Sequence, residues 1–114
     1  MNLIEHLTMK GELSVVVKDE STGTIKQAFT VPNLVVSVGK AYIASRMVGT
    51  ASNVMSHMAI GTATTTPIVG DTTLGTEAGR VSVSAFTAST NTVTTTATFP
   101  AGTGTGAITE AGIL

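Results

Sequence analysis

Apolar and polar residues alternate along several short stretches of the chain, and this alternation predicts β-strands. A period of two places successive side chains on opposite faces of a sheet. The expected strands are 12–18, 24–31, 34–37, 56–61, 80–86, 91–99 and 107–114. The polar turn DESTG at 19–23 joins the first two strands into a hairpin. The link ASTN at 88–91 predicts a second hairpin, with Asn91 in the left-handed conformation that such loops need.

One segment has a helical period instead. Small and apolar residues recur at helical spacing at Val38, Ala41, Tyr42, Ser45 and Val48. Ser37 is a suitable N-cap, and Gly49 is a natural stop. The pattern therefore predicts one α-helix over about 38–48.

The elements together predict a mainly β fold, an antiparallel β-sandwich with one short helix. The length of 114 residues indicates one domain, 1–114. Within it, 1–32 forms an N-terminal hairpin suited to attachment, and 33–114 forms the core. Long Thr/Gly-rich loops are expected at 62–75 and around 102–106, because Pro and Gly there oppose regular structure.

Composition adds a statement about the surface. Charged residues make up 11% of the chain, against about 25% in ordinary proteins, while apolar residues make up 42%. So little charge, together with a mean hydropathy of +0.38, predicts a surface that is partly covered by other chains. A net charge of −1 and thinly spread basic residues argue against nucleic acid as a partner.

The two ends of the chain carry further expectations. Glu5 and His6 interrupt any apolar signal segment, so no signal peptide is expected. No stretch approaches the roughly 18 apolar residues of a membrane span, which predicts no membrane insertion. The chain ends on Ile113 and Leu114, inside an expected strand. Either this strand pairs with a neighbouring chain, or the native protein continues beyond Leu114, and we favour the second.

No catalytic, cofactor-binding or metal-binding residue is predicted. His57 with Asp71 and a serine is the one combination with the composition of a hydrolase triad, but no GxSxG elbow accompanies it. His57 lacks nearby residues with ligand spacing, so we interpret it as structural and His6 as solvated. The chain has no cysteine, which excludes thiolate chemistry.

The remaining candidates have simpler interpretations. Asp19 and Glu20 are turn residues, and Asp71 and Glu77 are too few for paired-carboxylate or calcium chemistry. The glycines of GTGTG at 102–106 lack the Lys-Ser/Thr of a phosphate loop and predict a flexible link between strands. Four methionines are interpreted as core residues (Met9, Met47, Met55, Met58). The four aromatic residues are too few to interleave with basic ones for nucleic-acid binding (Phe29, Tyr42, Phe86, Phe99).

Several short signatures occur in a fixed order in the second half of the chain. They are HMAIGT at 57–62, Pro67, Gly70-Asp71, LGTE at 74–77, Arg80 and ITEAG at 108–112, preceded by NLVVSVGKAYIASRMVG. In this order they resemble a family of small structural proteins of tailed bacteriophages, over about 33–114. In that family the closing motif usually continues into one or two further strands, which supports the expectation of a longer native chain. Leu74 is expected to anchor the long loop, and Glu77 and Arg80, three residues apart, to form an ion pair.

The resemblance implies a place on the surface of a virion that is assembled in the host cytoplasm. We expect a tail-fibre or tail-tip protein that takes part in host attachment; the alternative is a capsid decoration protein that stabilises the shell. The implied partners are other virion proteins, tail or major capsid protein, and further copies of this chain, commonly as trimers. A host-surface glycan or receptor is a further expected partner. A carbohydrate-binding module is a distant alternative, because sugar sites usually present several stacking aromatics.

Overall fold

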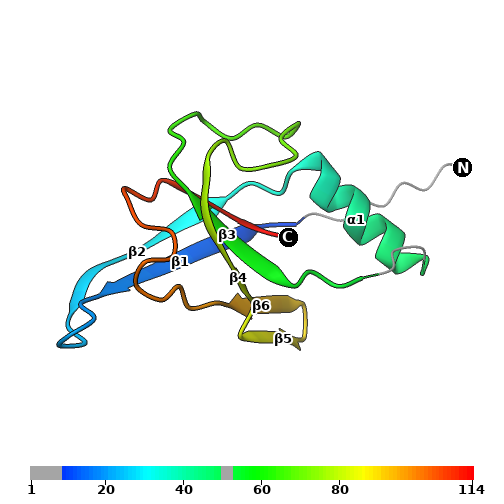
Figure 1. Ribbon diagram of the computed structural model, residues 1–114. Coiled ribbons are helices and arrows are strands. Elements are labelled where there is room, and N and C mark those ends of the chain that lie inside the picture. Colours follow the sequence, from blue (N-terminus) through cyan, green and yellow to red (C-terminus); the bar gives the residue numbers. More distant parts are fainter. Residues whose placement is uncertain (1–8, 50–52) are drawn as a thin grey trace, which may run out of the picture.

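The computed structural model describes residues 9–49 and 53–114. In these residues it has seven strands and one helix (Figure 1). The strands are β1 (Gly11–Lys18), β2 (Ile25–Asn33), β3 (His57–Gly61), β4 (Glu77–Ser82), β5 (Ala85–Ser89), β6 (Thr92–Thr96) and β7 (Glu110–Ile113), and the helix is α1 (Ser37–Met47). All strand pairs are antiparallel. The predicted mainly β fold with one short helix is therefore confirmed.

The N-terminal hairpin consists of β1 and β2, as the alternation predicted. Its turn is held by Asp19, whose Oδ1 accepts hydrogen bonds from the backbone N–H groups of Ser21 (2.9 Å) and Thr22 (3.1 Å). Such side-chain acceptance is the usual reason for Asp at a turn. The second strand was expected to end at residue 31, but β2 continues through Pro32 to Asn33. Both strands of a two-stranded sheet are edge strands, where proline is tolerated.

The central sheet has the order β4-β3-β7, and its two faces differ in character. One face is apolar and carries Met58, Ile60, Val81, Ala111 and Ile113, with Gly79. The other face carries His57, Ala59, Gly61, Glu77, Arg80, Ser82, Glu110 and Gly112. The register between the strands places these residues. The loop between β3 and β4 contacts the second face, as described below.

The predicted strand 80–86 is divided between two sheets. Its first part belongs to β4, and its last two residues begin β5, which pairs with β6. Between them, the N–H of Val83 donates to Ser56 O and that of Ser84 donates to Thr96 O, so the chain passes from one sheet to the other. In the β5–β6 turn, Thr90 has the left-handed conformation (φ 55°) that was expected of Asn91.

The helix begins one residue earlier than predicted. Ser37 is its first residue and Val36 its N-cap, without a side-chain capping bond. The N–H of Ser37 donates instead to Val69 O in the long loop (2.7 Å). The predicted strand 34–37 is absent, because this segment runs directly into the helix without a partner strand. No helix in the described ranges has the length and apolar content needed to cross a membrane.

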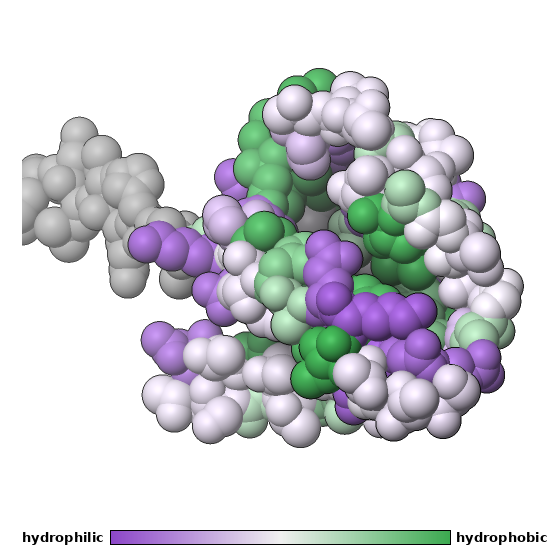
Figure 2. All heavy atoms as spheres, turned by 90° about the vertical axis from the view of Figure 1, so that its left-hand side faces the viewer, coloured by the Kyte–Doolittle hydropathy of each residue, from purple (hydrophilic) through white to green (hydrophobic). Residues whose placement is uncertain are grey.

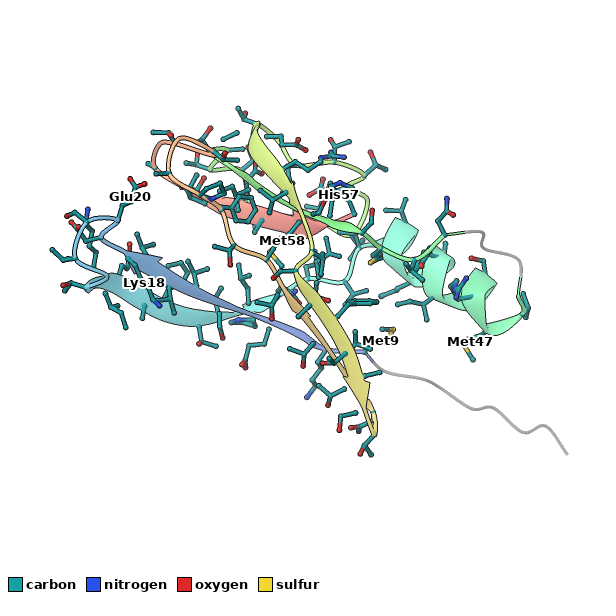
Figure 3. All side chains as sticks on the ribbon, turned by 60° about the horizontal axis from the view of Figure 1, so that its bottom comes forward. Met9, Lys18, Glu20, Met47, His57 and Met58 are labelled. Carbon is teal, nitrogen blue, oxygen red and sulfur yellow. The ribbon has the colours of Figure 1, made fainter. Side chains whose placement is uncertain are left out.

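The expected inward side of the helix is confirmed only in part. The half-buried residues are Gly39, Tyr42, Ile43 and Ser45, so Tyr42 and Ser45 agree with the prediction, whereas Val38 and Val48 are exposed. The methionine prediction is confirmed only in part: Met55 and Met58 are half-buried, whereas Met47 is 72% exposed and Met9 is exposed as well (Figure 3). Met47 is the last residue of α1, and Met9 lies two residues before β1.

The three sheets enclose little interior. Instead of two sheets that close over a dry core, the described residues form three small sheets, β1-β2, β4-β3-β7 and β5-β6. Ala59 is the one apolar residue among them that is fully shielded from solvent. On the face of the molecule that Figure 2 shows, apolar residues lie exposed in several patches and line a hollow. The fold is thus open on the apolar side of its central sheet and is not a closed sandwich.

Two glycines in and after the helix provide a matched test of its structure. A Cβ at Gly39 would lie 3.8 Å from Val35 Cγ1, an ordinary contact, so Gly39→Ala should raise the free energy of unfolding by about 0.5–1 kcal/mol. Gly49 has φ +73°, so Gly49→Ala should lower it by about 1 kcal/mol. Urea unfolding at one protein concentration measures both. Shifts of the same sign would contradict this account of the helix end.

Candidate functional site

The residues considered for catalysis do not come together. Ser56 Oγ lies 2.7 Å from Nδ1 of His57, and Ser82 Oγ lies 3.5 Å from its Nε2, so serine hydroxyls stand beside both ring nitrogens. Asp71 accepts a hydrogen bond from the N–H of Ile68 in its own loop (3.0 Å). A triad needs a carboxylate on the second ring nitrogen, and Asp71 is engaged elsewhere. His6 lies outside the described residues.

The acidic residues are dispersed in the same way. Asp19 holds its turn, and Glu77 forms a two-point pair with Arg80, with Oε1 2.7 Å from Nη2 and Oε2 3.2 Å from Nε. The predicted Glu77–Arg80 pair is therefore confirmed. Within 9–49 and 53–114, no three His, Asp or Glu side chains gather as they would around a metal ion.

Glu110, at the start of β7, is a polar side chain that connects segments far apart in the sequence. Its Oε1 accepts hydrogen bonds from the backbone N–H groups of Thr76 (2.7 Å) and Ala63 (3.4 Å). Its Oε2 accepts one from the N–H of Gly75 (2.9 Å). One carboxylate thereby binds both ends of the long loop between β3 and β4. We call this arrangement the Glu110 junction.

Close packing and backbone bonds complete the Glu110 junction. Gly61 pairs with Glu110 across β3 and β7, and a Cβ at Gly61 would overlap the Glu110 carboxylate and Thr76 O. The N–H of Thr109 donates to Gly61 O (2.9 Å), and its hydroxyl donates to Ala63 O (2.6 Å). The Leu74 side chain lies against Gly112, which agrees with its expected role as the anchor of the loop.

The Glu110 junction brings three of the sequence signatures into one place. Gly61 belongs to the signature at 57–62, Gly75 and Thr76 to that at 74–77, and Glu110 to that at 108–112. The signatures are far apart in the chain, so their meeting is a property of the fold.

The electrostatics of Glu110 favour the ionised form. Hydrogen bonds from the backbone N–H groups of Thr76, Gly75 and Ala63 lower the pKa of its carboxyl below the ordinary value of 4.5, against the opposing effect of burial. A carboxylate whose oxygens already accept these bonds is poorly placed to act as a general base. Its chemistry is that of a structural anion that fixes a loop.

A second feature is a groove of about 980 Å³ on the apolar side of the central sheet. It is lined by the base of the β1–β2 hairpin, by β6, and by Met58, Ala111 and Ile113 of the central sheet. The GTGTG segment packs next to this region. Gly104 (φ +72°) lies so close to Ile60 and Gly79 that a side chain there would overlap Ile60. The close approach, as well as the turn, requires glycine.

Sequence reasoning missed both features. Glu110 carried a usable signal, because a lone carboxylate inside an expected core strand must find hydrogen-bond donors. The groove left no signal, because it depends on how three sheets are placed in space.

A scan of protein-family models, a search of curated proteins and a search of solved structures each found no match to this chain.

Replacing the carboxylate tests the Glu110 junction. Glu110→Gln has one acceptor oxygen in place of two, and its amide N–H₂ would face a backbone donor. We expect a lower melting temperature and faster amide hydrogen exchange at Gly75 and Thr76. Glu77→Gln is the matched control, because it alters an exposed pair on the same sheet, and such pairs contribute little. Equal effects of the two substitutions would show that the loop does not depend on Glu110.

The lowered pKa of Glu110 also predicts a pH dependence. Above pH 4.5 the carboxyl is ionised in both folded and unfolded chains, and its contribution to stability is complete. As the pH falls below 4.5, the unfolded chain binds a proton first, and the contribution is lost as the pH passes through the folded-state pKa. The difference in melting temperature between the native protein and Glu110→Gln should therefore shrink in acid. A difference that stays constant from pH 7 to about pH 3 would contradict this assignment.

Proposed function

We propose that this chain is a non-enzymatic structural subunit of the surface of a tailed-bacteriophage virion, of the tail-fibre or tail-tip type. The resemblance of its ordered signatures to phage structural proteins supports the proposal. The observation that carries it is the open apolar side of the fold, which indicates a chain that is completed by neighbours.

The size of the exposed surface supports an assembly role. A compact monomer of 11.5 kDa exposes about 5,800 Å², whereas this chain exposes 8713 Å². Counting the eleven residues outside the described ranges as fully exposed accounts for about 1,600 Å² of the difference. The remaining excess, about 1,300 Å², is more than the roughly 800 Å² that one partner buries in a standard interface.

The polar residues also support a structural role. The side chains with catalytic potential each serve the fold: Asp19 holds a turn, Asp71 holds a loop, and Glu110 joins three segments. Threonine makes up about a fifth of the chain, and its hydroxyl keeps exposed strand faces hydrated without adding charge. Such strands suit a durable particle surface.

Capsid decoration is the second candidate function. The observation in its favour is the β1–β2 hairpin, which extends away from the rest of the chain (Figure 1) and is suited to reach a neighbouring shell protein. A carbohydrate-binding module is less well supported. The two exposed phenylalanines, Phe29 and Phe86, lie on different sheets and so do not form one stacking platform.

The copy number of the protein on purified particles tests the proposal. Virions from the source of this sequence are purified on a density gradient, and the chain is counted by quantitative mass spectrometry against the major capsid protein. A tail-fibre or tail-tip subunit should be present in tens of copies or fewer per particle. Hundreds of copies would favour decoration instead. If the chain is absent from intact virions, the proposed function is wrong.

A further inference from the structure

The β1–β2 hairpin has an apolar face that its own chain does not cover. The register pairs Leu13 with Val31, Val15 with Phe29 and Val17 with Gln27, so these six side chains share one face. We call this set, five apolar residues and one glutamine, the apolar hairpin face. It carries no charged residue.

The opposite face of the same hairpin is different. It presents Glu12, Ser14, Lys18 and Thr30 among Val16, Ala28 and Pro32. Ser14 and Thr30 hydrogen-bond to each other through their side chains across the strands (3.0 Å). One face of the hairpin therefore carries charged residues and the other carries none. In antiparallel sheets of this kind, the face without charge usually packs against another layer.

Exposure shows how incompletely the apolar hairpin face is covered. Leu13 and Val15, near the base, are half-buried. Their partners on β2, Val31 and Phe29, are 40% and 39% exposed, and Val17, nearer the turn, is 41% exposed. The hairpin projects from the body of the molecule, so the remaining strands leave these residues partly in solvent (Figure 1). Burying apolar side chains such as Phe and Val is favourable, so a covering partner is expected.

We propose that the apolar hairpin face is the surface through which copies of this chain associate. The proposal rests on the proposed function, since it names the contact by which such a subunit assembles. A symmetric contact brings the same residues of two copies together, and opposed like charges are costly there. The absence of charge on this face makes it self-complementary. The surface excess of about 1,300 Å² per chain is enough for a stable contact between copies.

The groove adds a second reason for a neighbouring copy. Leu13 belongs to the apolar hairpin face and also lines the groove beside the central sheet. The two surfaces are therefore continuous at Leu13. A copy that docks on the hairpin would lie beside the groove, whose lining also includes the charged residues Lys10, Glu12 and Lys40.

The mass of the purified protein in solution tests this contact. Phe29 and Thr30 are neighbours in β2 on opposite faces of the hairpin, so substitutions at these two positions form a matched pair. By light scattering at micromolar concentration, the native protein should have the mass of two or more chains of 11.5 kDa. Phe29→Asp should weaken association about 30-fold or more, as loss of a central apolar contact does, and Thr30→Asp less than about threefold. A monomeric native protein overturns the proposal, as does an equal effect of the two substitutions.

Cross-linking keeps the test decisive if Phe29→Asp prevents folding. The chain has no cysteine, so one can be introduced at a single position. Under mild oxidation, Val17→Cys should give a covalent dimer at a rate at least about tenfold above that of Lys18→Cys, since a disulfide needs Cα atoms within about 7 Å. Equal rates would overturn the proposal even if the protein is oligomeric.

These outcomes are distinct from those for the proposed function. Both experiments use the purified chain alone, whereas the copy-number measurement uses intact particles. A chain that occurs on virions but is monomeric in solution would overturn this inference only. A chain that oligomerises through the hairpin but is absent from virions would overturn the proposed function only.

Discussion

The hydrogen bonds of the Glu110 carboxylate are the interaction on which the central sheet and its long loop depend. It accepts backbone hydrogen bonds from Ala63, Gly75 and Thr76, and so fixes both ends of a loop with little regular structure of its own. A long loop has a large conformational entropy, and its closure needs specific bonds. Since β7 brings Glu110 to the loop only when it pairs with β3, sheet formation and loop closure depend on each other.

The two sides of the central sheet differ in how far the chain itself covers them. On the side of Glu110, the chain satisfies its own polar groups and packs Leu74 over Gly112. On the other side, Met58 and Ile113 line an open groove, and the nearby hairpin leaves Phe29 half in solvent. The first side gives the chain a defined fold, and the second side leaves apolar surface exposed. The proposed structural role needs both properties.

The local elements could be predicted from sequence because neighbouring residues determine them. The alternation in β1 and β2, the turn residue Asp19 and the helix stop at Gly49 all act within a few residues. The division of the expected strand 80–86 could not be predicted, because the bonds of Val83 and Ser84 go to residues 27 and 12 positions away. Glu110 finds its donors 34 to 47 residues earlier in the chain. The open interior depends on how three sheets are arranged, which no local pattern records.

Low charge and an open apolar side have a common consequence for stability. A chain of this length ordinarily buries about two-thirds of the surface that its unfolded form exposes, and this one buries less. If copies cover the apolar hairpin face, the free energy gained at that contact belongs to the folded state only, and stability rises with protein concentration by mass action. Folding and assembly then reinforce each other. The Glu77–Arg80 pair lies on the far side of the central sheet and does not oppose this contact.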